Sequence, residues 1–201
     1  MRLLILPLLC VLPIPVLAGT KGADLSGDPS LDLDWAGRVT ASDPKVRAPA
    51  EAALVQGAGR SLPLLRRLLD RGDEDLDLRT FRIIQRIGPP AIPLLVDLLR
   101  DERVSIRRGA VDELIDLAPD TARIQPALQR ALRDEDADVA GDAARALGAL
   151  GRRAAPSVRA LVETLAHGDP YVRIYAAEAL AAIGPKAGAA SRDLGLSLIH
   201  I

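Results

Sequence analysis

Side chains that commonly carry out catalysis or bind metal ions are scarce in this chain. Its 201 residues include one cysteine, Cys10, and two histidines, His167 and His200. A structural zinc site takes about four cysteine, histidine or carboxylate ligands, and this set is too small to supply one. The sequence also lacks a Gly-x-Ser-x-Gly nucleophile motif, a phosphate-binding loop and a His-Glu-x-x-His pair. We therefore predict that the protein is not an enzyme and carries no metal or cofactor.

Two clusters of acidic residues could bind a cation. The first contains Asp73, Glu74, Asp75 and Asp77, and the second, Asp-Glu-Asp-Ala-Asp, spans residues 134–138. Neither contains the full Asp-x-Asp-x-Asp-Gly pattern of a calcium loop. Carboxylates are favoured at helix N-termini, where they accept hydrogen bonds from free backbone N–H groups and interact well with the helix dipole. We interpret both clusters as helix caps.

The strongest pattern in the sequence is an internal repeat. Val46, Leu76, Ile106, Val139 and Val172 occupy equivalent positions, at intervals of 30, 30, 33 and 33 residues. Self-similarity at this period is typical of arrays in which each unit buries its apolar face only against its neighbours. Two further aliphatic positions follow in every copy, eight and 22 residues later. The predicted structural core is Leu54, Ile84, Leu114, Leu147 and Leu180 at the first position, and Leu68, Leu98, Leu128, Leu161 and Leu194 at the second.

Each copy is predicted to form two helices joined by a tight turn. In the fifth copy, Asp169 and Pro170 provide an N-cap and a first-turn proline, and apolar residues recur with helical spacing up to Ile183. Gly184 and the proline after it then end the helix. Because the second helix follows after only a few residues, the two helices must be antiparallel. The predicted units are residues 42–71, 72–101, 102–134, 135–168 and 169–195 of an array that spans 42–195.

The motif Asp-Pro-x-Val-Arg occurs at residues 43–47 and 169–173, and an Ala-rich helix, an Ile-Gly-Pro turn and a Leu-rich second helix follow the second copy. This arrangement resembles HEAT repeats, specifically the short bacterial kind that also occurs in phycobilin lyases. The resemblance implies an all-α fold, a right-handed α-α superhelix (solenoid) of about five helical hairpins. It also implies that the second helices line the concave side.

Three copies depart from the pattern. Gly57 stands where other copies have Ile or Leu, which predicts an early end to the first helix of repeat one. Arg103 replaces the capping aspartate in repeat three, and Ala140 follows the leading valine in repeat four. In repeats one, three and five an arginine follows the leading residue, and we predict that these side chains form bonds between adjacent repeats: Arg47, Arg107 and Arg173.

Arginines of the second helices are the candidate partner-binding residues. In the geometry that the resemblance implies, they would line the concave side and could hold carboxylate or phosphate groups of a partner. Acidic residues such as Asp70, Asp97 and Glu163 lie among them, so local ion pairs on a solvated surface are the alternative. The candidates are Arg67, Arg100, Arg130, Arg159 and Arg192.

The two ends of the chain have features of their own. Residues 1–18 combine Arg2, an apolar stretch and a final alanine, which is typical of a signal peptide, although a retained anchor is the alternative. We expect residues 19–41 to form a flexible leader and a short capping helix that starts at Pro29 and contains Trp35. Residues 196–201, Leu-Ser-Leu-Ile-His-Ile, resemble translated sequencing-adapter DNA and are interpreted as an artefact, with a genuine helix end as the alternative.

These features predict a non-catalytic scaffold, exported to the periplasm or cell exterior, that binds an unknown protein or peptide. The net charge of −1 gives no general attraction to nucleic acid, and no membrane span is expected after signal cleavage. We expect a monomer or part of a larger chain. Two alternatives are open: chromophore attachment or chaperoning like that of phycobilin lyases, and the repeat segment of a truncated multidomain protein.

We predict that Leu128→Ala lowers the free energy of unfolding by about 2–5 kcal/mol, because Leu128 lies mid-array and its truncation leaves a cavity. Urea denaturation followed by circular dichroism measures this difference. A loss below about 0.5 kcal/mol, the size of an ordinary surface substitution, would contradict the register of the repeat.

Overall fold

The computed structural model describes residues 29–117 and 121–184. Every regular element in this part of the chain is a helix, which confirms the predicted all-α solenoid. No helix among these residues is both long enough and apolar enough to cross a membrane. The signal peptide, the leader, Arg192, Leu194 and residues 196–201 lie outside the described residues.

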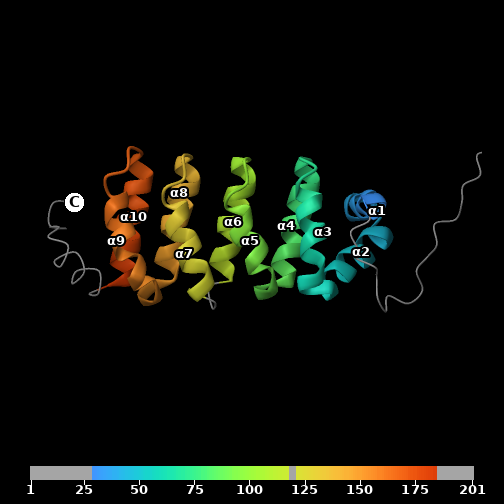
Figure 1. Ribbon diagram of the computed structural model, residues 1–201, viewed down its shortest axis with the longest axis horizontal. Helices are drawn as coiled ribbons and strands as arrows, with labels where there is room; N and C mark the ends of the chain where they lie inside the picture. The colour runs from blue at the N-terminus through green and yellow to red at the C-terminus, as the bar shows by residue number, and fades with distance from the viewer. Residues whose placement is uncertain (1–28, 118–120, 185–201) are drawn as a thin grey trace, which may run out of the picture.

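Helix pairs stand side by side along the long axis of the molecule in chain order (Figure 1). The first helices of successive repeats are α2 (Pro44–Gly57), α4 (Glu74–Ile87), α6 (Val104–Asp116), α8 (Ala137–Ala149) and α10 (Pro170–Ile183). The second helices are α3 (Leu62–Leu69), α5 (Ile92–Leu98), α7 (Thr121–Ala131) and α9 (Val158–Thr164). The capping helix α1 (Pro29–Thr40) packs against α2, α3 and α4 at one end. Short 3-10 segments lead into three second helices: η1 (Ala58–Ser61), η2 (Pro89–Ala91) and η3 (Gly151–Ser157).

Aspartate side chains start four of the first helices. Asp43, Asp73, Asp136 and Asp169 each accept a hydrogen bond from a backbone N–H of the first turn, which satisfies a donor that has no partner within the helix. The capping interpretation of the two acidic clusters is confirmed for Asp73 and Asp136. In α6 the cap position holds Arg103, whose side chain does not cap; instead, its backbone N–H donates to the Asp101 carboxylate at 3.0 Å.

The core is one continuous aliphatic cluster that extends through all the described helix pairs. Of the ten predicted core residues, nine lie in the described part of the chain, and each is at most 5% exposed. Burial of one such side chain contributes about 1.5–3 kcal/mol. Trp35 and Val39 of α1 are also buried, so the capping helix extends this cluster over the first repeat.

Val46 does not share the burial of its equivalents. Its side chain is 41% exposed, whereas those of Leu76, Ile106, Val139 and Val172 are at most 2% exposed. In the other copies this position packs on the first helix of the preceding repeat. Repeat one has no preceding repeat, and α1 leaves Val46 uncovered. At the end of the array, therefore, a residue's position in the repeat does not predict whether its side chain is buried.

The predicted early end of α2 at Gly57 is also wrong. Helices α2, α4 and α10 are each 14 residues long. The turn that ends α2 is made by Ala58, with φ 44° and ψ −122°, at the position where Gly88 and Gly184 have φ 75° and 80°. Gly57 itself keeps a helical conformation, so the helix continues through it. In repeat one, therefore, Ala58 adopts a backbone conformation that favours glycine, because the Cβ of any other residue is strained there.

We expect Ala58→Gly to raise the free energy of unfolding by about 1 kcal/mol, because removal of the Cβ relieves strain that exceeds the extra entropy of glycine in the unfolded chain. Gly88→Ala is the reciprocal control and should destabilise the protein by a similar amount or more. Thermal or urea unfolding measures both. A loss of stability in Ala58→Gly would show that the positive φ at residue 58 carries no strain.

Candidate functional site

Three arginines secure the junctions between repeats in the same way. The Nη1 of Arg47 donates to the carbonyl oxygens of residues 41 and 42 at 2.7 and 3.4 Å. Arg107 does the same to residues 101 and 102, at 2.9 and 3.1 Å, and Arg173 to residues 167 and 168, both at 2.8 Å. In each case the acceptors belong to the loop that links the helix to the preceding element. Arg107 and Arg173 therefore bond between adjacent repeats, as predicted, whereas Arg47 bonds the loop that follows the capping helix α1.

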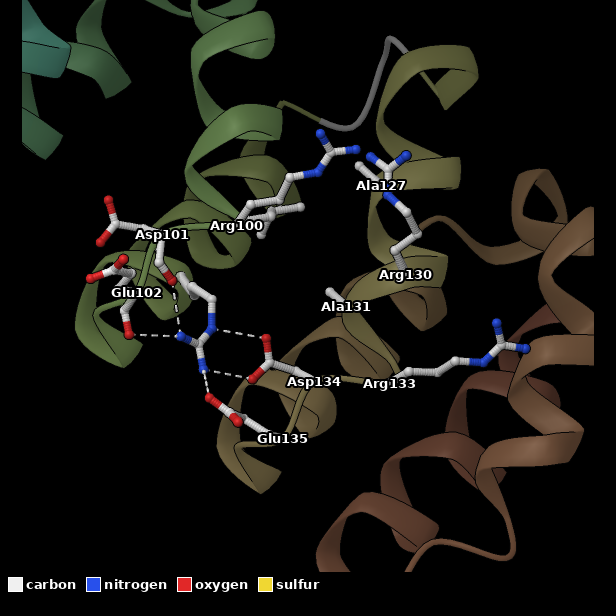
Figure 2. A pocket seen from close by; sticks show the side chains of 11 residues that line it. Arg100, Asp101, Glu102, Ala127, Arg130, Ala131, Arg133, Asp134 and Glu135 are labelled. Atoms are coloured by element: carbon white, nitrogen blue, oxygen red, sulfur yellow. Dashed lines mark hydrogen bonds and ion pairs between the residues drawn. The ribbon is translucent and has the colours of Figure 1, made fainter.

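Arg107 also reaches the next junction (Figure 2). Its Nε and Nη2 donate to the two carboxylate oxygens of Asp134, each at 2.9 Å. The two side chains are only 7% and 10% exposed. The hydrogen bond to Asp134 raises the pKa of Arg107 above its usual value, so the guanidinium stays charged. The bidentate pair of Arg107 and Asp134 therefore links two loops. Its donors and acceptors are used within the protein and are not available to a ligand.

The candidate partner-binding arginines do not form one row. Two residues after the core leucine of each second helix stand Asp70, Arg100, Arg130 and Glu163 in successive repeats. Arg159 lies two residues before its leucine instead. We placed Arg100 on the second helix, but it lies just beyond the end of α5. The chain forms a turn there, in which the backbone N–H of Arg100 donates to the carbonyl oxygen of Asp97. Arg67 is on α3 and half-buried.

Acidic neighbours neutralise the arginines of the outer repeats. Arg66 pairs with Asp70 at 2.9 Å, and Arg159 pairs with Glu163 at 3.3 Å, both four residues apart on one helix. Arg133, just after α7, also bonds Glu163 at 2.7 Å. The hydrogen bonds from Arg133 and Arg159 hold the pKa of Glu163 below its usual value. Here the local ion pairs that we considered as the alternative are present.

Arg100 and Arg130 form a different group, named here the arginine pair. Both are exposed, and within residues 29–117 and 121–184 the side chain of neither makes an ion pair. They line the same hollow of about 560 Å³, whose walls come from α6, α7 and the loops after α5 and α7. Figure 2 shows both side chains extending away from Asp134. This arrangement can accept an anionic group.

A second depression lies between the first helices α4 and α6 and was missed by the sequence analysis. This α4–α6 groove has a volume of about 390 Å³. Its lining residues combine an apolar floor with carboxylates: Glu74, Asp77, Leu78 and Phe81 from α4, and Ser105, Ile106, Gly109, Asp112 and Glu113 from α6. In the sequence, only the single phenylalanine, Phe81, could have indicated this groove. The repeat pattern alone does not predict that Phe81 lies at a groove.

Carboxylates of the groove are poorly compensated. The Oδ1 of Asp77 and the Oε2 of Glu113 are buried and have no hydrogen-bond partner among the described residues. Burial, together with the nearby charges of Asp116 and Asp112, raises the pKa of Glu113 to about 7. Burial also raises the pKa of Asp77 and of Asp112. Arg103 only partly compensates the negative charge of Asp77, because its Nη1 donates to the Oδ2 of that carboxylate alone, at 3.1 Å. No set of three or more possible ligands in the described ranges is arranged to hold a metal ion.

The family model for HEAT repeats matches residues 62–148 and 124–192, which together are more than half of the sequence. The chain belongs to the HEAT-repeat family. This assignment confirms the resemblance seen in the Asp-Pro-x-Val-Arg motif and in the paired helices. No curated protein is similar enough in sequence to count as a relative of this HEAT-repeat protein.

Solved structures share its fold. A crystal structure of an engineered protein has a TM-score of 0.54 and 24% identity, and the match covers 82% of this chain and 85% of that one. The complex of CpcE and CpcF of phycocyanin lyase from Nostoc sp. PCC7120 has a TM-score of 0.52 and 23% identity, covering 76% of this chain and 99% of that one. At this level of identity the likeness concerns the fold alone.

The raised pKa of Glu113 predicts a specific dependence of stability on pH. Between about 4.5, its ordinary pKa, and about 7, the folded state holds more protons than the unfolded chain. The free energy of unfolding therefore falls as the pH rises through this range. Since Glu113→Gln removes the titration, we expect the variant to gain stability relative to the wild type from about pH 5 to about pH 8.

Urea denaturation at each pH tests this expectation. The exposed Glu178 of α10 provides the control, because Glu178→Gln should change stability by the same small amount at every pH. A difference between Glu113→Gln and the wild type that is constant across the range would show that Glu113 titrates normally.

Proposed function

We propose that this HEAT-repeat protein is a non-catalytic scaffold that binds an acidic segment of a partner protein or peptide through the arginine pair. The observation that carries the proposal is the exposure of Arg100 and Arg130 at one hollow, with no carboxylate partner for either side chain among residues 29–117 and 121–184. We expect the second helices to line the concave side of the array, as the resemblance to HEAT repeats implies, and an extended segment bound there would contact both arginines.

Charge complementarity favours an acidic partner. A guanidinium can donate two parallel hydrogen bonds to one carboxylate, which gives direction as well as attraction. Arg66 and Arg159 are already paired with Asp70 and Glu163, whereas Arg100 and Arg130 have no such partner in the described part of the chain. Because the helices around the hollow are held by a continuous core, little conformational entropy is lost on binding.

The other functional expectations stay predictions. Export depends on residues 1–18, which lie outside the described residues. Chromophore attachment has only the fold of the phycocyanin lyase complex in its favour. Mixing the protein with a bilin tests it directly, and a shifted absorption band would support that alternative over the scaffold.

Fluorescence anisotropy with a labelled peptide of alternating Glu and Ala tests the scaffold proposal. We expect the double variant Arg100→Gln/Arg130→Gln to bind this peptide at least about fivefold more weakly than the wild type, because two charge-assisted contacts are lost. Arg152 of η3 provides a matched control, since it is also exposed but does not line the hollow. Arg152→Gln should bind as the wild type does. Equal weakening by both variants would show general charge attraction and overturn the proposal.

A further inference from the structure

One aromatic ring lies between α4 and α6 at the α4–α6 groove. A Cβ added to Gly109 of α6 would lie 2.8 Å from Cε2 and Cζ of Phe81, so the ring rests directly on the glycine. By contrast, a Cβ on Gly148 of α8 would lie 3.1 Å from the Cα of Ala179 in α10. There the two backbones themselves approach, and α8 and α10 contact each other far more extensively than α4 and α6 do. The seam beside Phe81 is therefore the more open of these two.

The floor of the open seam is apolar and reaches solvent. Leu78 is 62% exposed and lies beside Phe81 and Ile106 in the groove lining. An exposed leucine alone needs no explanation, because most protein surfaces contain some apolar area. Here, however, the leucine borders a cavity of about 390 Å³, a size at which pockets begin to enclose ligands.

The rim of the groove carries only one sign of charge. Glu74, Asp77, Asp112 and Glu113 all line it, and no arginine or lysine does. Asp112 makes one long ion pair, at 3.4 Å, with Arg145 of α8, and Asp77 uses one of its two oxygens for Arg103. The buried oxygens of Asp77 and Glu113 make no hydrogen bond within the described ranges. A buried oxygen without a hydrogen bond costs free energy. A cationic donor bound in the groove would therefore contribute more binding free energy than the same donor on an ordinary surface.

We propose that the α4–α6 groove is a docking site for a basic, leucine-containing segment of a partner protein. An arginine or lysine of the segment lies between the carboxylates of α4 and α6, with its aliphatic stem on Phe81. A neighbouring leucine of the segment covers Leu78. This chemistry fits the groove better than a small metal cation would, because a metal ion leaves the apolar floor exposed and needs ligands that converge on one point.

The raised pKa of Glu113 agrees with this occupant. Its carboxylate is disfavoured by burial and by its acidic neighbours in the free protein, and a cation in the groove would oppose both effects. The proposal is independent of the function assigned to the arginine pair, because the hollow and the groove have no lining residue in common.

Fluorescence anisotropy with the labelled peptide Leu-Arg-Leu-Arg-Leu tests the proposal, with Leu-Glu-Leu-Glu-Leu as the comparison peptide. We expect the basic peptide to bind at least about tenfold more tightly. Leu78→Ser and Glu113→Gln should each weaken its binding by about fivefold. Both substituted positions can change without unfolding the protein, since one is largely exposed and the other exchanges a carboxylate for an isosteric amide.

The repeat supplies a matched control for the apolar contact. Ile174 of α10 stands at the position equivalent to Leu78 and is 49% exposed, but it does not line the α4–α6 groove. Ile174→Ser and Arg100→Gln/Arg130→Gln should both leave binding of the basic peptide within about twofold of the wild type. Equal binding of the two peptides, or equal weakening by Leu78→Ser and Ile174→Ser, would overturn the proposal. Dimerisation would also overturn the proposal if sedimentation experiments detect it and Leu78→Ser abolishes it. The occupant of the groove would then be a second copy of the chain.

Discussion

Each helix pair in this protein has an apolar face that only the next pair can cover, and the rest of the structure depends on this constraint. It explains why the equivalent leucines of different repeats are all buried, since each lies between two units. It also explains Val46, which has the right residue type but no unit in front of it. A side chain in such an array is buried by its neighbours in the stack as much as by its own helix.

Stacking brings the loops between repeats together and takes their backbone oxygens away from water. A carbonyl that is shielded from water needs a hydrogen-bond donor from the protein. Arg47, Arg107 and Arg173 donate to such oxygens at the junctions before α2, α6 and α10, and the Asp134 carboxylate balances the most buried of these arginines. Charged groups that make no such bonds are the candidates for ligand binding.

The sequence predicted the repeat, the helix caps and the core because these depend on local pattern and on a fixed register. It did not predict which arginines are available, because ion pairs such as Arg133 with Glu163 join different repeats and because Arg100 lies beyond the helix on which we placed it. The α4–α6 groove was also out of reach, because it requires the contact of Phe81 with Gly109 across two helices. The raised pKa of Glu113 was out of reach for a similar reason, because it depends on how far the folded structure buries the carboxyl group beside Asp116 and Asp112.

A net charge of −1 conceals this separation of charge within the molecule. Repeats two and three contribute both the arginine pair, beside the second helices, and the carboxylates of the groove, between the first helices. A uniformly charged polymer would be attracted by one of these surfaces and repelled by the other, and both forces fade within about 10 Å at moderate salt. Non-specific electrostatic attraction therefore gains little on this scaffold. Binding at either surface requires a segment whose charge and apolar side chains match that surface at close range, which is the basis of specificity.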